Sequence, residues 1–118
     1  MASLKERGVA FYVAREGAQL LGFGAIAARC ADEGGIAWGE LKRMYVAPAA
    51  RGRRVGRLIL DRLLEHAKGK GIAVLRLETG NKQMEALSLY RSTGFAHRGP
   101  FADYPDNESS IFMEMRIA

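Results

Sequence analysis

The hydrophobic pattern of the chain changes its period at Val55. Beyond this point apolar residues recur at helical spacing while charged residues take the other side, which predicts an amphipathic helix. The apolar side consists of Val55, Leu58, Ile59, Leu63, Leu64 and Ala67. Before this point, residues 9–15, 19–28 and 36–46 are rich in β-forming residues and are separated by turn signals. We therefore expect a three-stranded antiparallel meander that leads into the helix.

The remainder of the chain continues the mixture of strands and helices. Residues 72–78 form a nearly continuous apolar run, which is typical of a strand covered on both faces and reached by a helical crossover. Residues 83–92 predict a second helix, which Gly94 ends at the position where a left-handed residue is favoured. Alternation over 111–117 predicts a last strand with one buried face. The expected fold is α/β (α+β), with the order βββαβα, a loop and β, in a mixed, mostly antiparallel sheet.

Length and composition favour one soluble domain. A chain of 118 residues, 48% of them apolar, can bury one core but is too short for two ordinary domains, so we expect a single unit over 1–118. No export signal and no apolar run long enough to span a membrane is visible. The only cysteine, Cys30, cannot form an internal disulfide, and no Cys/His cluster has zinc-ligand spacing. We expect a cytoplasmic protein without a metal site.

The positive charge of the chain is concentrated in one segment. Lys and Arg outnumber Asp and Glu by 18 to 13, a formal net charge of +5, which favours anionic partners in general. Several of the arginines lie close together, namely Arg43, Arg51, Arg53, Arg54 and Arg57. This clustering predicts a local anion site and not a basic face.

The segment Arg51–Arg57 carries two glycines, Gly52 and Gly56, between a predicted strand and a predicted helix. Backbone N–H groups at a helix start lack partners and point outward with the positive end of the helix dipole, so such a place binds phosphate. The spacing excludes a P-loop, because three residues separate the glycines and Arg57-Leu58 follows them. The dinucleotide fingerprint G-x-G-x-x-G is also absent. The alternative is a basic helix start in which the glycines serve only the turn.

Two stretches of the chain resemble the signatures of the GNAT superfamily of N-acetyltransferases. Residues 40–60 look like its coenzyme A motif, in which a strand ending in x-V-x-P is followed by Arg/Gln-x-x-Gly-x-Gly/Ala and an apolar helix. The second stretch looks like A-x-x-L-Y-x-x-x-G-F and consists of Ala86, Leu89, Tyr90, Gly94 and Phe95. The resemblance covers roughly residues 9–117, and two signatures at the expected separation are more specific than either alone.

The resemblance implies where acetyl-coenzyme A is held. The backbone of residues 44–46 should pair with the pantetheine arm like an added strand, and the amides of residues 51–57 should hold the pyrophosphate. The implied cofactor residues are Met44, Tyr45, Val46, Arg51, Gly52, Arg53, Arg54, Val55, Gly56, Arg57 and Gln83. Arg54 stands where the family usually has glycine, so its side chain must point away from the phosphates or add a contact to them. Gln83 replaces the family's usual asparagine.

Acetyl transfer to an amine requires removal of the amine proton, stabilisation of an oxyanion and a proton for the leaving thiolate. Tyr90 resembles the family's general acid, and its alternative role is an aromatic anchor in helix packing. Glu40 is our candidate base because it lies on the strand entering the motif, and its alternative role is a solvated strand carboxylate. The resemblance gives the oxyanion to the Val46 N–H. His66 and His97 are expected to be surface residues.

The acceptor and the assembly are less constrained. The family usually begins with a strand and one or two helices, whereas few residues precede Val9, so we expect a fold that lacks these elements and a homodimer that covers the exposed edge. The acceptor is expected to be a small-molecule or peptide amine. The loop before the last strand carries polar residues that could meet a cationic amine or simply be solvated, namely Asp103, Tyr104, Asp106 and Glu108.

Two other functions compete with acetyl transfer. A nucleic-acid-binding module would use the arginine-rich segment, but the strands carry few aromatic residues in the pattern that base stacking requires. A catalytically idle coenzyme A-binding subunit would bind the cofactor and transfer nothing.

Overall fold

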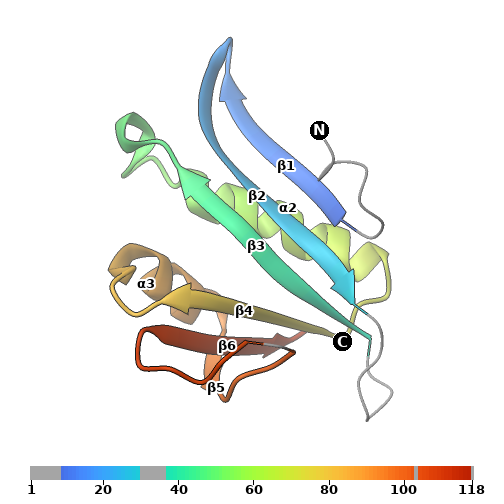
Figure 1. Ribbon diagram of the computed structural model, residues 1–118. Helices are drawn as coiled ribbons and strands as arrows, with labels where there is room; N and C mark the ends of the chain where they lie inside the picture. Colours follow the sequence, from blue (N-terminus) through green and yellow to red (C-terminus); the bar gives the residue numbers. More distant parts are fainter. Residues whose placement is uncertain (1–8, 30–36, 103, 118) are drawn as a thin grey trace.

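The computed structural model describes residues 9–29, 37–102 and 104–117, which form a six-stranded sheet and two α-helices (Figure 1). The strand order in the sheet is β1-β2-β3-β4-β6-β5. The elements are β1 (Val9–Glu16), β2 (Gln19–Arg29), β3 (Trp38–Val46), the short 3₁₀ helix η1 (Pro48–Ala50), α2 (Val55–Gly69), β4 (Val74–Gly80), α3 (Met84–Thr93), β5 (Ala96–Arg98) and β6 (Ser110–Arg116).

Each strand and helix expected from the sequence is present, with ends that shift by no more than two residues. The mixed sheet is confirmed, because β3 and β4 pair in parallel and all other described pairs are antiparallel. The expected start of the third strand, Ile36, lies outside the described residues. The sequence does not predict η1 and β5, which are each three residues long and therefore too short to show a period.

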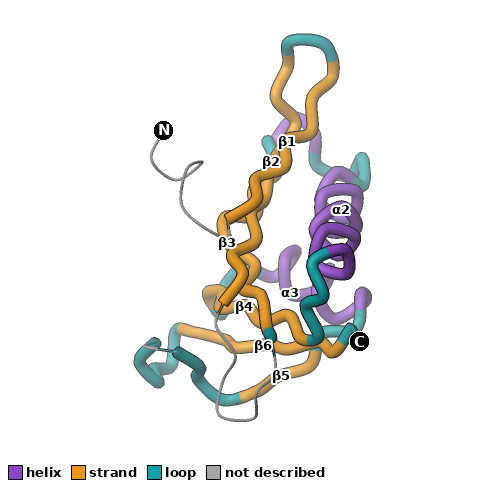
Figure 2. Tube along the Cα trace, turned by 90° about the vertical axis from the view of Figure 1, so that its right-hand side faces the viewer, coloured by secondary structure: helices purple, strands orange, loops and turns teal. Residues whose placement is uncertain are grey.

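Both helices lie on the same side of the sheet (Figure 2). The face of α2 that packs on the strands is Val55, Ile59, Leu60, Leu63 and Ala67. The expectation that Leu58 belongs to this face is wrong, since its side chain is 58% exposed while Leu60 is fully buried. These two residues lie about 200° apart around a helix of 3.6 residues per turn, so both cannot face the sheet. No helix in the described part of the chain is long and apolar enough to cross a membrane.

The opposite face of the sheet has a smaller core of its own. Trp38, Val74, Phe101 and Phe112 are buried there, and Tyr104 packs against them. The ring centroids of Trp38 and Phe101 are 5.5 Å apart, and those of Phe101 and Phe112 are 5.6 Å apart, both with edge-on geometry. This core fixes the segment between β5 and β6 against the sheet.

The sheet opens between β3 and β4. The two strands pair only from Trp38 to Leu41 on β3, and they separate toward their C-terminal ends (Figure 1). At the point of separation the register between β2 and β3 shifts, because Phe23 pairs with Tyr45 whereas Ala25 pairs with Lys42. A β-bulge of this kind increases twist and turns a strand away from its neighbour. The end of β3 is thereby freed from β4.

Glycines on β2 accommodate this bulge. A Cβ atom on Gly22 would lie 2.5 Å from the carbonyl oxygen of Tyr45. A Cβ atom on Gly24 would lie 2.7 Å from the Met44 sulfur and 2.8 Å from Cγ2 of Ile59. The close approach of β2, β3 and α2 therefore requires residues without side chains at these positions.

We expect Gly22→Ala to lower the free energy of unfolding by about 1–3 kcal/mol, because the new methyl group collides with the backbone of β3. Urea denaturation followed by circular dichroism measures the change. Gly69→Ala is the matched control, since no atom lies within 4 Å of its Cβ position. The control should leave stability unchanged or raise it by up to about 1 kcal/mol. Equal stabilities of the two variants would contradict the packing described for β2 and β3.

Candidate functional site

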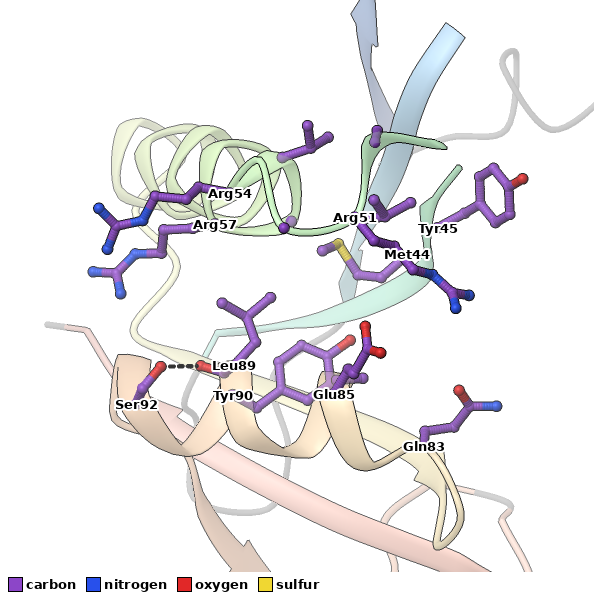
Figure 3. Close-up of a pocket in the computed structure, with 16 residues that line it drawn as sticks. Met44, Tyr45, Arg51, Arg54, Arg57, Gln83, Glu85, Leu89, Tyr90 and Ser92 are labelled. Atoms are coloured by element: carbon purple, nitrogen blue, oxygen red, sulfur yellow. Dashed lines mark hydrogen bonds between the residues drawn. The ribbon is translucent and has the colours of Figure 1, made fainter. Parts of the chain in front are cut away.

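A cavity of about 500 Å³ lies between the end of β3, the start of α2 and the length of α3 (Figure 3). Every cofactor residue implied by the resemblance lines this cavity, apart from Arg53. The lining residues among them are Met44, Tyr45, Val46, Arg51, Gly52, Arg54, Val55, Gly56, Arg57 and Gln83. The opening of the sheet and the start of the helix thus contribute to one site.

Arg53 faces away from the cavity. Its Nη2 atom lies 2.8 Å from Oε2 of Glu16 at the end of β1, and its backbone N–H donates to the carbonyl of Ala50 at 3.2 Å. Neither the guanidinium group nor the amide is therefore directed at a ligand in the cavity.

The helix α3 contributes a row of three residues to the cavity, two of which the sequence signatures do not include. Glu85, Leu89 and Ser92 line the cavity at intervals of one helical turn, which places them on one face of α3 (Figure 3). Leu89 belongs to the second signature, whereas Glu85 and Ser92 do not. The spacing from Leu89 could have identified this face, because Glu85 lies four residues before it and Ser92 three residues after it.

The first turn of α2 is suited to an anion. It contains no acidic residue, and no side chain caps it. The N–H groups of Val55, Gly56 and Arg57 come before Leu58, whose N–H donates to the Arg54 carbonyl at 3.1 Å, so these three have no intrahelical partner. The dipole of the helix places positive potential at the same point. This end of the cavity can accept phosphate oxygens.

The residue that precedes α2, Arg54, has a left-handed backbone, with φ 61° and ψ 25°. Its side chain and that of Arg57 extend in the same direction beyond the helix, while Arg51 lies at the other side of the opening (Figure 3). Arg57 Nε also bonds Oδ1 of Asp61 at 3.1 Å. The backbone conformation gives a physical reason for glycine to be the family's usual residue at position 54.

A second cavity, of about 450 Å³, adjoins the first. The residues lining both are Met44, Tyr45, Gln83, Ala86 and Tyr90, so the cavities meet at the opening of the sheet. Glu40 and Tyr104 line the second cavity alone, and Asp106 and Glu108 line neither. Asp103 and Cys30 lie outside the described residues.

Glu40 is buried, with 2% of its surface exposed. Its Oε1 atom accepts hydrogen bonds from Nη2 of Arg29 at 2.8 Å and from Nε at 3.2 Å. Its Oε2 atom accepts a hydrogen bond from the hydroxyl of Tyr104. The alternative of a solvated strand carboxylate is therefore wrong for Glu40.

Tyr90 lies where the two cavities meet, and it is only 5% exposed. Its ring packs edge-on against Phe95 with centroids 5.7 Å apart, so it does anchor the helix. Its hydroxyl has no hydrogen-bond partner within the described part of the chain. Burial raises the pKa of Tyr90 to about 12, which keeps the phenol protonated at neutral pH. Because a thiol has a pKa near 8.5, such a phenol is a better hydrogen-bond donor to a thiolate than a source of a complete proton.

The histidines lie outside both cavities. The expectation of a surface position is correct for His97, which is exposed and bonds Arg91 Nη2 at 3.3 Å. It is only partly correct for His66, which is half-buried and whose Nδ1 atom bonds the hydroxyl of Tyr12 at 3.1 Å. The described residues contain no group of three or more His, Cys, Asp or Glu that could hold a metal ion.

Comparisons with known proteins agree with this geometry. A family model described as an acetyltransferase (GNAT) domain matches residues 7–97. An IAA acetyltransferase from Azospirillum brasilense is 44% identical over 114 residues, which are 97% of this chain and 72% of that protein. A crystal structure from Klebsiella pneumoniae, whose name places it among the acyl-CoA N-acyltransferases, superposes with a TM-score of 0.83 at 35% identity and covers 93% of this chain and 73% of that one. The PaiA N-acetyltransferase from Thermoplasma acidophilum, solved in complex with coenzyme A, has a TM-score of 0.79 at 23% identity over 98% of this chain and 65% of that one, which supports the fold alone.

We expect Arg54→Gly to raise the free energy of unfolding by about 1 kcal/mol, because glycine adopts the left-handed conformation without the cost that a Cβ atom imposes. Arg54→Ala is the control, since it removes the guanidinium group but keeps the Cβ atom. Guanidinium chloride denaturation of both variants measures the difference. If the two variants are equally stable, the backbone at position 54 is not strained.

Proposed function

Because the chain belongs to the GNAT acetyltransferase family, we propose that it moves an acetyl group from acetyl-coenzyme A directly to a primary amine of a small molecule or peptide. The observation that carries this proposal is the opening between β3 and β4 beside the first turn of α2. The opening joins a cavity with anion-binding groups to a second, more polar cavity. We take residues 1–118 as one acetyltransferase domain.

The residues at the first cavity fit the chemical parts of coenzyme A. The end of β3, Met44–Val46, has a backbone edge that β4 does not pair, and such an edge accepts the amide groups of an extended chain. The N–H groups of Val55–Arg57 suit a pyrophosphate, and the guanidinium group of Arg51 can neutralise its charge. When bound, the cofactor supplies a thioester carbonyl that an amine attacks with release of a thiolate.

The protein groups then act on the charges that develop. In this proposal the Val46 N–H donates to the oxyanion, and the neutral Tyr90 hydroxyl donates a hydrogen bond to the leaving sulfur. Glu40 remains our candidate base. Both of its oxygens are occupied by Arg29 and Tyr104, so the amine proton reaches it through the Tyr104 hydroxyl, which lines the second cavity.

The competing functions have less support. Arg53 and Arg57 of the arginine-rich segment are bonded to carboxylates of Glu16 and Asp61, which weakens a nucleic-acid interface. A catalytically idle subunit would have the same cofactor site as an active enzyme, so only a measurement of activity separates these two functions. The homodimer stays a prediction, and β1 is an edge strand among the described residues.

We expect the protein to bind acetyl-coenzyme A with one-to-one stoichiometry in isothermal titration calorimetry. Gly56→Leu should weaken binding at least about tenfold, because a side chain there would enter the space beside Leu89 and Val46, which lie 3.2 Å and 3.5 Å from the Cβ position. Gly69→Leu, at the far end of the same helix, should leave the Kd unchanged. Absence of binding to the unmodified protein at millimolar ligand would refute the proposed function.

We expect Tyr90→Phe to lower kcat by about 10–100-fold with little change in the Kd of acetyl-coenzyme A, since a hydrogen bond to a charged atom contributes about 1.5–3 kcal/mol. Thiol release in the presence of a panel of amines measures kcat. Tyr12→Phe removes a hydroxyl that bonds His66 outside the cavities and serves as the control. Normal cofactor binding without transfer by the unmodified protein would favour the idle subunit.

A further inference from the structure

The second cavity has two walls of opposite charge. β3 and β4 separate beyond the pair Leu41–Leu77, so the residues that follow on each strand face one another across the opening. Lys42 and Arg43 line the cavity from β3, and Glu78 lines it from β4. One side of the opening is therefore cationic and the other is anionic.

The charges on these walls are not satisfied by the protein. Within the described residues, neither Lys42 nor Arg43 forms an ion pair, and Glu78 accepts a single side-chain hydrogen bond, from the hydroxyl of Ser110 at 2.7 Å. The other carboxylate of this cavity, Glu40, is already neutralised by Arg29 at 2.8 Å. Two cations and one anion thus remain available to a ligand.

The neighbouring charges on the same face of the sheet are paired. Arg76 and Arg98 contact Oε1 of Glu114 at 2.8 Å and 2.6 Å, and the planes of Trp38 and Phe101 cover the two guanidinium groups. The strands of this face thus place opposite charges in contact where the sheet is closed. The charges without an ion-pair partner lie at the opening, where an acceptor would meet the proposed thioester.

We propose that the acceptor is a free amino acid, an inference that rests on the proposed acetyl transfer. The carboxylate of the amino acid binds Lys42 and Arg43 by charge-assisted hydrogen bonds. Its ammonium group is attracted by Glu78 and lies on the side of the cavity where Tyr104 and Glu40 accept the proton. A cavity of about 450 Å³ is within the size range of small-molecule sites.

The charges of the two walls disfavour amines that carry no anionic group. An amine without an anionic group would leave Lys42 and Arg43 unmatched and would place a third cation beside them. An acid without an amine would lack the nucleophile. Only a molecule that carries both groups satisfies both walls and the reaction.

The test compares the standard amino acids with their methyl esters, which keep the amine and the side chain but lose the negative charge. The rate of thiol release from acetyl-coenzyme A gives kcat/KM for each compound. We expect at least one amino acid to be acetylated with a kcat/KM at least about tenfold above that of its ester. Lys42→Gln combined with Arg43→Gln should abolish this preference and leave the Kd of acetyl-coenzyme A within about twofold. Glu78→Gln should lower kcat/KM for an amino acid and its ester by similar factors, because both carry the amine.

Lys68→Gln combined with Lys70→Gln removes two exposed charges at the far end of α2 and is the matched control, which should keep the preference. Equal or better acetylation of the esters, or a preference that survives in the double variant at 42 and 43, overturns the inference while acetyl transfer itself stands. Normal binding of acetyl-coenzyme A with no acetylation of any compound also overturns it. If the protein does not bind acetyl-coenzyme A, the proposed acetyl transfer is refuted, and not only the inference about the acceptor.

Discussion

The separation of β3 from β4 is the constraint on which the rest of the molecule depends. The register shift beside Arg43 turns the end of β3 away, and Gly22 and Gly24 let this distorted segment lie against β2 and α2. The separation frees a backbone edge, brings the first turn of α2 to that edge and connects two cavities of different character. The unpaired N–H groups of α2 and the buried carboxylate of Glu40 thereby lie on different sides of a single opening.

The order of elements and the first cavity could be predicted because their signals are local. The change of period at Val55, the glycines of the loop and the spacing of Ala86, Leu89 and Tyr90 each span a few residues. The burial of Glu40 could not be predicted in this way, because it depends on Arg29 and on Tyr104, which is 64 residues away in the chain. The same holds for His66, whose partner Tyr12 is 54 residues away.

Local patterns also fail where they are too short or too ambiguous. The three residues of β5 form a strand only because β6 pairs with them. Leu58 fits a helical repeat as well as Leu60 does, and the direction from which the sheet approaches decides between them. The charges of Lys42, Arg43 and Glu78 are visible in the sequence, but their opposition across an opening appears only when the strands separate.

Four register pairs, from Trp38–Val74 to Leu41–Leu77, are the only backbone ladder between β1–β3 and β4–β6 in the described residues. The two halves of the sheet otherwise hold together through side chains, which are those of the two cores and the hydrogen bond from Tyr104 to Glu40. A ligand that pairs with the free end of β3 and contacts α3 at the same time fastens these halves. Binding at one hundred times the Kd adds about 2.7 kcal/mol to stability. A fall in the supply of such a ligand would therefore lower the stability of the folded protein and raise the fraction of unfolded chain that proteases can degrade.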